Sequence, residues 1–546
     1  MFGVSLTYGF VWDDLTLVRD RGLLHSLGNW REIVFAPYLN TAAGGIYRPL
    51  SLLSFAVNFA IFGEGGWSFH AVNVLLHALN AWLVFALIRR LTDDTRLSFW
   101  AGLWFALLPI HTEAVAAIVG RLELLAAAFG IYTLLLLFPE PRHPQPNSIL
   151  PLTRIIFASV CFLLAILSKE QALAILPLYV CLTLVLAKIQ QQPLRAALWN
   201  IRRVILWLSL AVAVYLLGFR LLALGPFTFT GDVTITRIEN FLAFLPRWQR
   251  VGTAFKILWL YAVKSVWPVT LSTDYGFAQI PAAHMGDWQA WAGAALAMAV
   301  VWLAMRPLVW RADRWIWSFA AWLIIWPLLP VSNLFFIIGT NMGDRLMYLP
   351  SIGVCLILAL LTVTLTTRAR WSGGLMVLAF LVSFYGWRSH SRALDWRTED
   401  TLLASAAAAS PQSLRVRTDI ATGWLYAGKD REAERELRSV LQLYPDYFHA
   451  VHNLGLVYKH QGRLALAERQ FWHALRCADD RRVYQNLALV YFEQGRYDRA
   501  RAMLEQRFPG QPELSAAFLA YLFKRKFTSQ DALAKPQAIA YSGERP

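Results

Sequence analysis

Apolar segments as long as a bilayer is thick follow one another through most of the chain. A helix needs ~20 apolar residues to cross the hydrocarbon core, where only a helix or a closed barrel pairs every backbone polar group. A chain of this kind must fold largely as a bundle of membrane helices. We predict ten spans, at residues 69–91, 98–117, 120–138, 153–169, 171–187, 203–224, 288–306, 315–332, 346–367 and 371–388.

Basic residues indicate the direction of these spans. The net charge is +16, but the Lys and Arg residues lie in short clusters between apolar segments and form no single patch, so nucleic-acid binding is not indicated. Clusters such as Arg89-Arg90 and Arg202-Arg203 are typical of cytoplasmic loops. With these clusters inside, the N-terminal region, residues 225–287 and everything after Trp387 lie outside.

Two external segments have features of their own. In residues 225–287, the stretch Val251–Trp267 contains two lysines and predicts an interfacial or re-entrant helix; two additional crossings are the alternative. In residues 1–68, an amphipathic stretch from Tyr47 to Phe62 can lie flat on the membrane. Residues 1–12 are too short to span, and we expect them to be the end of a truncated first helix.

The sequence changes character after Pro411, where charges become dense and a repeat appears. Asn453 and Gly462 recur 33 residues later as Asn486 and Gly495. A glycine between helices and small residues at helix crossings are typical of tetratricopeptide repeats (TPRs), whose helix pairs stack into a solenoid with a concave binding surface. We predict three copies over residues 411–510, then a capping helix (Glu513 to Lys526) and a disordered tail within residues 511–546.

Several classes of protein are not indicated. The four cysteines show neither a CxxC pair nor metal-ligand spacing, which gives no sign of a disulfide framework or a zinc site. No G-x-S-x-G, Walker A, H-E-x-x-H or dinucleotide-binding glycine pattern occurs in a suitable context. These observations argue against a hydrolase, an ATP-driven pump and a membrane metalloprotease.

Charged and polar side chains gather at the external ends of the predicted spans. Acids in such a place can activate an acceptor hydroxyl, and cations near a bilayer surface suit a phosphate group. Together they describe a site where a lipid phosphate meets a polar acceptor. The residues are Asp13, Asp14, Arg48, His70, His111, Glu113, Arg121, Lys169, Glu170, Asp274, Asp344, Arg345 and Tyr348.

These residues also have structural alternatives. The acidic pair can cap a helix or lie in a solvated loop, and the histidines can be interior hydrogen-bonding residues. His111 and Glu113 would make at most a weak metal pair. The remaining alternative is a set of neutralising ion pairs, Lys169 with Glu170 and Arg345 with Asp344.

Seven short motifs carry a resemblance to a known family. They are Trp12-Asp13-Asp14, Tyr47-Arg48-Pro49-Leu50, Phe69-His70-Ala71-Val72-Asn73, Leu108-Pro109-Ile110-His111-Thr112-Glu113, Ser168-Lys169-Glu170, Asp274-Tyr275 and Arg345-Leu346-Met347-Tyr348. The set resembles the transmembrane and tetratricopeptide-repeat (TMTC-like) protein O-mannosyltransferases, which belong to the GT-C class of membrane glycosyltransferases. The resemblance extends over nearly the whole chain.

The resemblance implies an all-α protein with a polytopic GT-C domain over residues 69–390 and a C-terminal TPR solenoid. Such a protein moves a sugar from a polyprenyl-phosphate donor to Ser or Thr hydroxyls of a protein held by the repeats. The family's acidic motif maps to Asp13 and Asp14, one as general base and one positioning the acceptor. The implied donor-phosphate ligands are Arg345, Lys169, Arg121 and Arg48, and the site-shaping residues are His111, Glu113, Glu170, His70, Tyr348 and Asp274.

Two departures from the family pattern matter. Family members begin with a complete first transmembrane helix, which this chain does not show. The pair Asp13-Asp14 also replaces the Asp-Glu pair of the better-known protein O-mannosyltransferases, which leaves open which acid is the base.

Other functions stay open at the level of sequence. One is a GT-C enzyme that acts on lipid A or a cell-wall glycan, and another is a membrane-anchored TPR scaffold without activity. For the leading interpretation we expect a bacterial inner-membrane protein with its site and repeats in the periplasm. The expected partners are a lipid-linked mannose or other hexose, a protein acceptor and membrane lipids. We expect no cofactor, and no multidentate carboxylate cluster indicates a metal.

Overall fold

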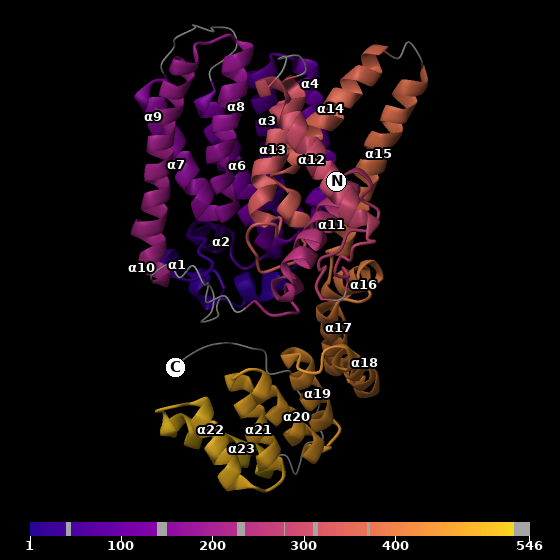
Figure 1. The fold of residues 1–546 in the computed structure, drawn as a ribbon. Coiled ribbons are helices and arrows are strands. Elements are labelled where there is room, and N and C mark those ends of the chain that lie inside the picture. The colour runs from indigo at the N-terminus through magenta and orange to yellow at the C-terminus, as the bar shows by residue number, and fades with distance from the viewer. Residues whose placement is uncertain are drawn as a thin grey trace. The chain divides into compact units, whose positions relative to one another are not determined.

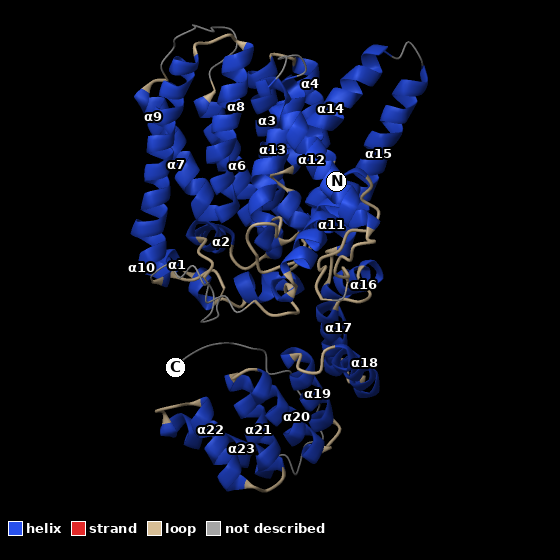
Figure 2. Ribbon diagram, in the orientation of Figure 1, coloured by secondary structure: helices blue, strands red, loops and turns tan. Residues whose placement is uncertain are grey.

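The computed structural model describes residues 1–39, 45–138, 150–225, 235–277, 279–309, 315–368 and 372–528. Across this part of the chain the structure consists of helices and loops without a strand (Figure 2), which confirms the predicted all-α class. The chain divides into two compact units. The first comprises Met1–Gly276 and Ile280–Ala409, and the second contains the helices from Ser410 onward.

The first unit is a bundle of long apolar helices (Figure 1). Among them α6 is the most deeply buried candidate span, and it packs against both α3 and α7. The helices that carry the predicted spans are α3 (Gly66–Thr92), α4 (Thr95–Leu107), α6 (Arg121–Leu137), α7 (Leu152–Ser168), α8 (Ile175–Ile189), α9 (Leu194–Ala213), α12 (Trp288–Val309), α13 (Trp315–Leu328), α14 (Ser351–Arg368) and α15 (Ser372–Asp395). The other helices of this unit are α1 (Trp30–Phe35), α2 (Pro49–Phe62), α5 (Thr112–Ala116), α10 (Leu221–Leu224), α11 (Arg247–Val266) and α16 (Glu399–Ala409).

Each of the ten predicted spans falls on a helix, but their lengths differ from those expected. Five described helices are long and apolar enough to cross a membrane, and six if a bent pair is counted as one. That pair is α4 with residues Pro109–Ala116, which meet at an angle of 50°. Proline has no N–H to continue a helical ladder, so Pro109 breaks the predicted span 98–117. The break sets His111 and Glu113 apart from the regular helix.

The segment between α10 and α12 contains the predicted helix. Helix α11 covers Arg247–Val266, and no described helix between Leu224 and Trp288 qualifies as a span. The Lys256 ammonium lies 2.8 Å from a carboxylate oxygen of Asp287, directly before α12. This ion pair fixes α11 against the start of the next helix.

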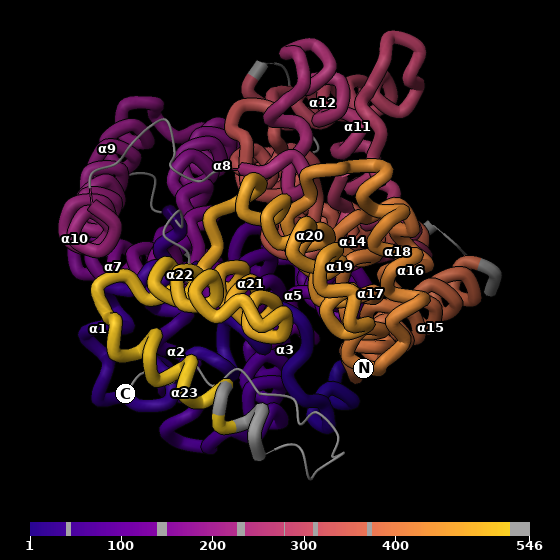
Figure 3. Tube along the Cα trace, turned by 90° about the horizontal axis from the view of Figure 1, so that it is seen from below, coloured from indigo at the N-terminus to yellow at the C-terminus, as the bar shows by residue number. Residues whose placement is uncertain are grey.

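The second unit is built from helix pairs, α17 (Leu414–Tyr426) with α18 (Asp430–Leu443), α19 (Phe448–His460) with α20 (Leu464–Cys477), and α21 (Arg481–Glu493) with α22 (Tyr497–Arg507). Each pair turns at a glycine with φ between 71° and 77°, namely Gly428, Gly462 and Gly495. A residue with a Cβ atom is strained in this backbone conformation, which explains why a glycine recurs at each of these turns. Helix α23 (Pro512–Thr528) follows at the predicted cap (Figure 3), and the predicted disordered tail lies outside the described residues.

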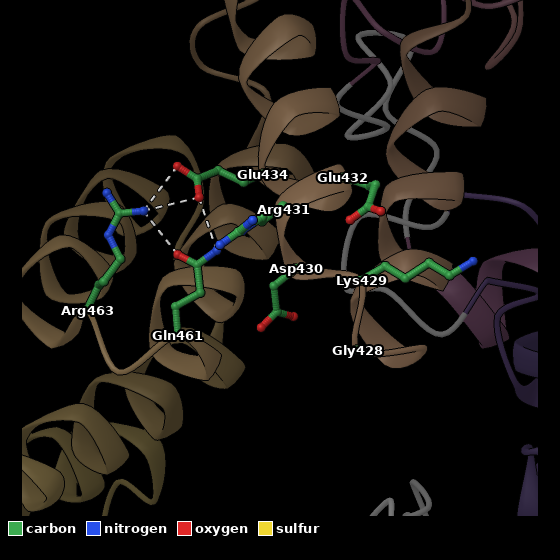
Figure 4. Close-up of a pocket in the computed structure, with 8 residues that line it drawn as sticks. All are labelled: Gly428, Lys429, Asp430, Arg431, Glu432, Glu434, Gln461 and Arg463. Atoms are coloured by element: carbon green, nitrogen blue, oxygen red, sulfur yellow. Dashed lines mark hydrogen bonds and ion pairs between the residues drawn. The ribbon is translucent and has the colours of Figure 1, made fainter.

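Successive pairs are joined by a repeated set of hydrogen bonds. Glu434 on α18 accepts from Gln461 at 3.0 Å and from Arg463 at 3.1 Å, and Figure 4 shows these three side chains converging beside an open surface pocket. One repeat later Glu468 on α20 accepts from Gln494 and from Arg496, the latter at 2.8 Å. A glutamate on each second helix therefore holds the turn of the following pair.

Replacing Glu468 with alanine is expected to loosen the stacking of the last repeat. The change removes charge-assisted bonds that are partly shielded from water, at a cost of about 1 kcal/mol. Hydrogen exchange of the full-length protein should show faster exchange in α21 and α22 and unchanged exchange in α17. Glu505→Ala is the matched control, because Glu505 pairs with Arg501 on the same helix and both side chains are exposed. Equal exchange in the two variants would contradict the role of Glu468.

Candidate functional site

Ion pairs connect segments that are distant in the sequence at one end of the helix bundle. Arg48 lies 3.0 Å from Glu170, and Lys169 lies 2.6 Å from Glu123. These contacts join the segment before α2 to the break between α7 and α8 and to the start of α6. We define the polar site as the side chains that meet here, which are Asp13, Tyr38, Arg48, Glu113, Glu123, Lys169, Glu170 and Arg345.

Arg345 is bound firmly to the break in the second span. Its backbone N–H and its guanidinium each donate to a different carboxylate oxygen of Glu113, both at 2.9 Å. Glu113 is buried, whereas about a third of the Arg345 side chain is exposed. The alternative pairing of Arg345 with Asp344 is wrong, because Asp344 instead accepts a hydrogen bond from the Tyr275 hydroxyl at 2.9 Å.

Lys169 and Glu170 do not pair with each other either. Both the Lys169 and the Glu123 side chains are more than nine-tenths buried, and the oxygen that binds Lys169 also lies 3.9 Å from Nε of Arg345. Sequence reasoning overlooked Glu123. An acid inside an apolar span is costly to bury, so its presence in the sequence was a signal of a functional residue. Tyr38, whose ring lies 5.1 Å from the Arg48 guanidinium carbon, carries no comparable signal in the sequence.

The two acids of the N-terminal motif have different environments. Asp14 is completely buried, and one of its oxygens accepts from the backbone N–H of Val119 at 2.8 Å. Asp13 is half-buried and interacts electrostatically with Arg345 and Tyr38. Trp12, directly before the pair, has a φ of 52°, which bulky residues rarely adopt outside constrained sites. The motif thus anchors one acid and directs the other to the polar site.

Burial makes Asp14 sensitive to pH. Burial raises the pKa of the Asp14 carboxyl from 3.8 to about 7, although the N–H of Val119 opposes the shift. The fold then prefers the protonated acid, so this preference stabilises it fully below pH 3.8 and is lost as pH rises through about 7. Its second oxygen has no hydrogen-bond partner in the described structure.

Asp14→Asn is expected to keep the fold and to make its stability less dependent on pH. Asparagine can still accept from Val119 and cannot ionise. The melting temperature of the variant should match that of the wild type near pH 4 and exceed it increasingly as pH rises, with the full difference reached above about pH 7. Asp20→Asn, at an exposed acid that pairs with Arg19, serves as the control. Parallel melting curves for wild type and Asp14→Asn across the pH range would disprove the assignment.

Arg121, predicted to bind phosphate, is engaged in helix packing. Its side chain is buried and donates to Asn73 at 3.0 Å, to Asn58 at 3.0 Å and to the Phe69 carbonyl at 2.9 Å. The rings of Phe55 and Phe69 lie beside its guanidinium. These partners hold α2, α3 and α6 together, and the geometry therefore gives no support to the predicted phosphate ligand.

Four other predicted residues make their hydrogen bonds with groups outside the polar site. His111 bonds to the Phe105 carbonyl and the Ser351 hydroxyl, and Tyr348 bonds to His77 and Asn80. His70 bonds to the Gly9 carbonyl, and Asp274 accepts from the backbone of Gly276. These contacts support the interpretation of the histidines as interior hydrogen-bonding residues. They give no support to a metal pair of His111 with Glu113.

One group of described residues in the second unit has the donor types of a metal site. Asp446, His473 and Cys477 place one ligand atom each within 4.8 Å of one another. His473 and Cys477 lie one turn apart on α20, and His473 is already 2.9 Å from Asp446. The sequence spacing does not reveal this group, because Asp446 lies before α19 and only the fold brings it to α20. In the polar site, by contrast, Glu113, Glu123 and Glu170 pair with Arg345, Lys169 and Arg48.

Comparison with known proteins agrees with this architecture. Residues 447–512 match the family model described as tetratricopeptide repeat. The chain is 25% identical to protein O-mannosyl-transferase TMTC3 of Homo sapiens, over 94% of this chain and 60% of that protein. It is 28% identical to protein O-mannosyl-transferase TMTC2 of Mus musculus, over 74% of this chain and 57% of that protein. The chain is therefore similar to the TMTC proteins over most of its length.

A third relative is also named a protein O-mannosyl-transferase. Protein O-mannosyl-transferase F38B6.6 of Caenorhabditis elegans is 27% identical over 73% of this chain and 54% of its own length. The TMTC-like chain thus spans a little over half the length of these relatives. No solved structure matches it. The apolar helices and these relatives together mark the TMTC-like chain as an integral membrane protein.

Proposed function

We propose that this protein is a membrane glycosyltransferase that moves a hexose, mannose in the first instance, from a polyprenyl-phosphate donor to Ser or Thr hydroxyls of another protein. The observation that carries the proposal is the polar site at one end of a membrane bundle. There Arg48, Lys169 and Arg345 are held by neighbouring carboxylates, and Arg345 also interacts electrostatically with a half-buried acid, Asp13. The names of the relatives support a protein acceptor and mannose.

In this mechanism the cations hold the donor phosphate. Arg345 and Arg48 present planar guanidinium groups that suit phosphate oxygens, and Lys169 adds a point charge. Glu113, Glu123 and Glu170 hold these cations in position. As the bond from the sugar C1 to the phosphate oxygen breaks, negative charge develops on that oxygen, and the cations stabilise it.

Asp13 is the proposed general base. As the acceptor oxygen attacks C1, its hydroxyl proton passes to the Asp13 carboxylate, and polyprenyl phosphate leaves from the opposite face of the sugar. Direct displacement of this kind inverts the configuration at C1. Asp14 acts as a positioning residue, because its bond to Val119 fixes the motif to the loop before α6.

The repeat unit is proposed to hold the acceptor protein. Stacked helix pairs of the TPR type present a continuous surface for extended segments. We place the protein in a bacterial inner membrane with the polar site and the repeats in the periplasm, since the basic clusters between spans lie opposite to the ends that carry the polar site.

Intact-mass profiling of envelope proteins tests this proposal. Cells that carry the wild-type chain should contain a protein whose mass exceeds that from Asp13→Asn cells by one or more hexoses. Asp20→Asn cells, with an exposed acid changed in the same segment, should match the wild type. Identical protein masses in all three strains, together with an altered glycolipid profile, would overturn the protein acceptor and favour a lipid or glycan.

A further inference from the structure

Glu123 is a buried carboxylate shared by two cations of the polar site. It lies in the first turn of α6, and one of its oxygens is 2.6 Å from Nζ of Lys169 and 3.9 Å from Nε of Arg345. Its other oxygen has no hydrogen-bond partner in the described structure. Glu123 and Lys169 also line a small cavity that is bounded further by Gln171 and Tyr348. The carboxylate is therefore buried inside the bundle, next to both cations.

The charges around Lys169 leave it dependent on Glu123. Arg48 and Arg345 face it from the segment before α2 and from the loop before α14, and both oppose its positive charge. Glu123 on α6 is the attracting group that contacts it, whereas the neighbouring Glu170 is paired with Arg48. A buried ammonium with cations nearby loses its proton unless a carboxylate compensates. Removing that carboxylate would take away the attraction that favours the protonated lysine, and would shift Lys169 towards its neutral form.

We propose that Glu123 is a positioning residue that keeps Lys169 protonated and holds Lys169 and Arg345 in place for the donor phosphate. The inference rests on the proposed function, and it assigns Glu123 a role without contact with the donor. A structural residue of the same burial would alter stability alone. Glu123 instead determines how phosphate binding depends on pH.

The test measures binding of polyprenyl monophosphate, without sugar, to the full-length protein in lipid nanodiscs by native mass spectrometry. A phosphate monoester has its second pKa near ~6, so the probe keeps its charge between about pH 7 and pH 9. Wild-type affinity should be nearly constant over this range. The Glu123→Gln affinity should fall by up to about tenfold per pH unit, because binding must then return one proton to Lys169.

The double variant Glu123→Gln/Lys169→Arg separates this role from a loss of packing. Both variants lack the carboxylate, but arginine stays protonated over the whole range, so the affinity of the double variant should again be constant with pH. The inference is overturned if Glu123→Gln follows the wild type at every pH. It is equally overturned if the double variant falls as steeply as Glu123→Gln.

Other outcomes are also decisive. If Glu123→Gln does not fold, Glu123→Asp and Lys169→Met replace it: the first should keep the flat profile, and the second should bind more weakly at every pH. Wild-type affinity in Lys169→Met would overturn the inference. If the wild type binds no polyprenyl phosphate, the proposed donor fails and this inference fails with it; if it binds and Glu123→Gln follows it, the inference fails alone.

Discussion

Asp13→Asn is expected to lower the rate of sugar transfer by at least about a hundredfold, the usual contribution of a general base. Asparagine has nearly the same shape and cannot take up the acceptor proton. Asp13 is the acid of the pair that reaches the polar site, as its interaction with Arg345 indicates, whereas Asp14 is completely buried. The measurement is transfer from a polyprenyl-phosphate sugar to a protein acceptor by the purified full-length protein.

Asp14→Asn provides the internal comparison. Its bond to Val119 survives the change, so we expect a loss of less than about tenfold in the same assay. Asp20→Asn should be fully active. The reverse order, with Asp14→Asn inactive and Asp13→Asn active, would move the role of base to Asp14. Full activity in both variants would remove the motif from the mechanism.

Sequence reasoning succeeded where one rule applied along the whole chain. The positive-inside rule placed Arg48, Glu170 and Arg345 at the same ends of the spans, and their segments do meet in the polar site. The recurrence of Gly462 as Gly495 after 33 residues predicted the helix pairs, and each of these glycines occupies a backbone conformation that side chains disfavour.

Sequence reasoning could not choose partners within the site. Adjacent residues such as Lys169 and Glu170 pair with Glu123 and Arg48, which are distant in sequence. Such choices depend on how helices pack, and no local pattern encodes them. Arg121 looked like the cations of the site, yet its neighbours Asn58 and Asn73 turn it into a packing residue.

Arg345→Met is expected to abolish transfer and also to destabilise the protein. The substitution leaves the buried carboxylate of Glu113 without the guanidinium that compensates it, at a cost of about 3–5 kcal/mol. Loss of activity in this variant alone would therefore be ambiguous. The double variant Glu113→Gln/Arg345→Met removes both charges and should recover most of the lost thermal stability.

Transfer by the double variant should nevertheless stay at least about a hundredfold below the wild type, because the Arg345 guanidinium then no longer stabilises the leaving phosphate. Lys256→Met is the matched control, since it breaks a buried ion pair of α11 that lies outside the polar site. It should lower the melting temperature while the rate per folded molecule stays unchanged. If the double variant instead regains both stability and activity, Arg345 serves only to neutralise Glu113, and the phosphate must be held by Arg48 and Lys169 alone.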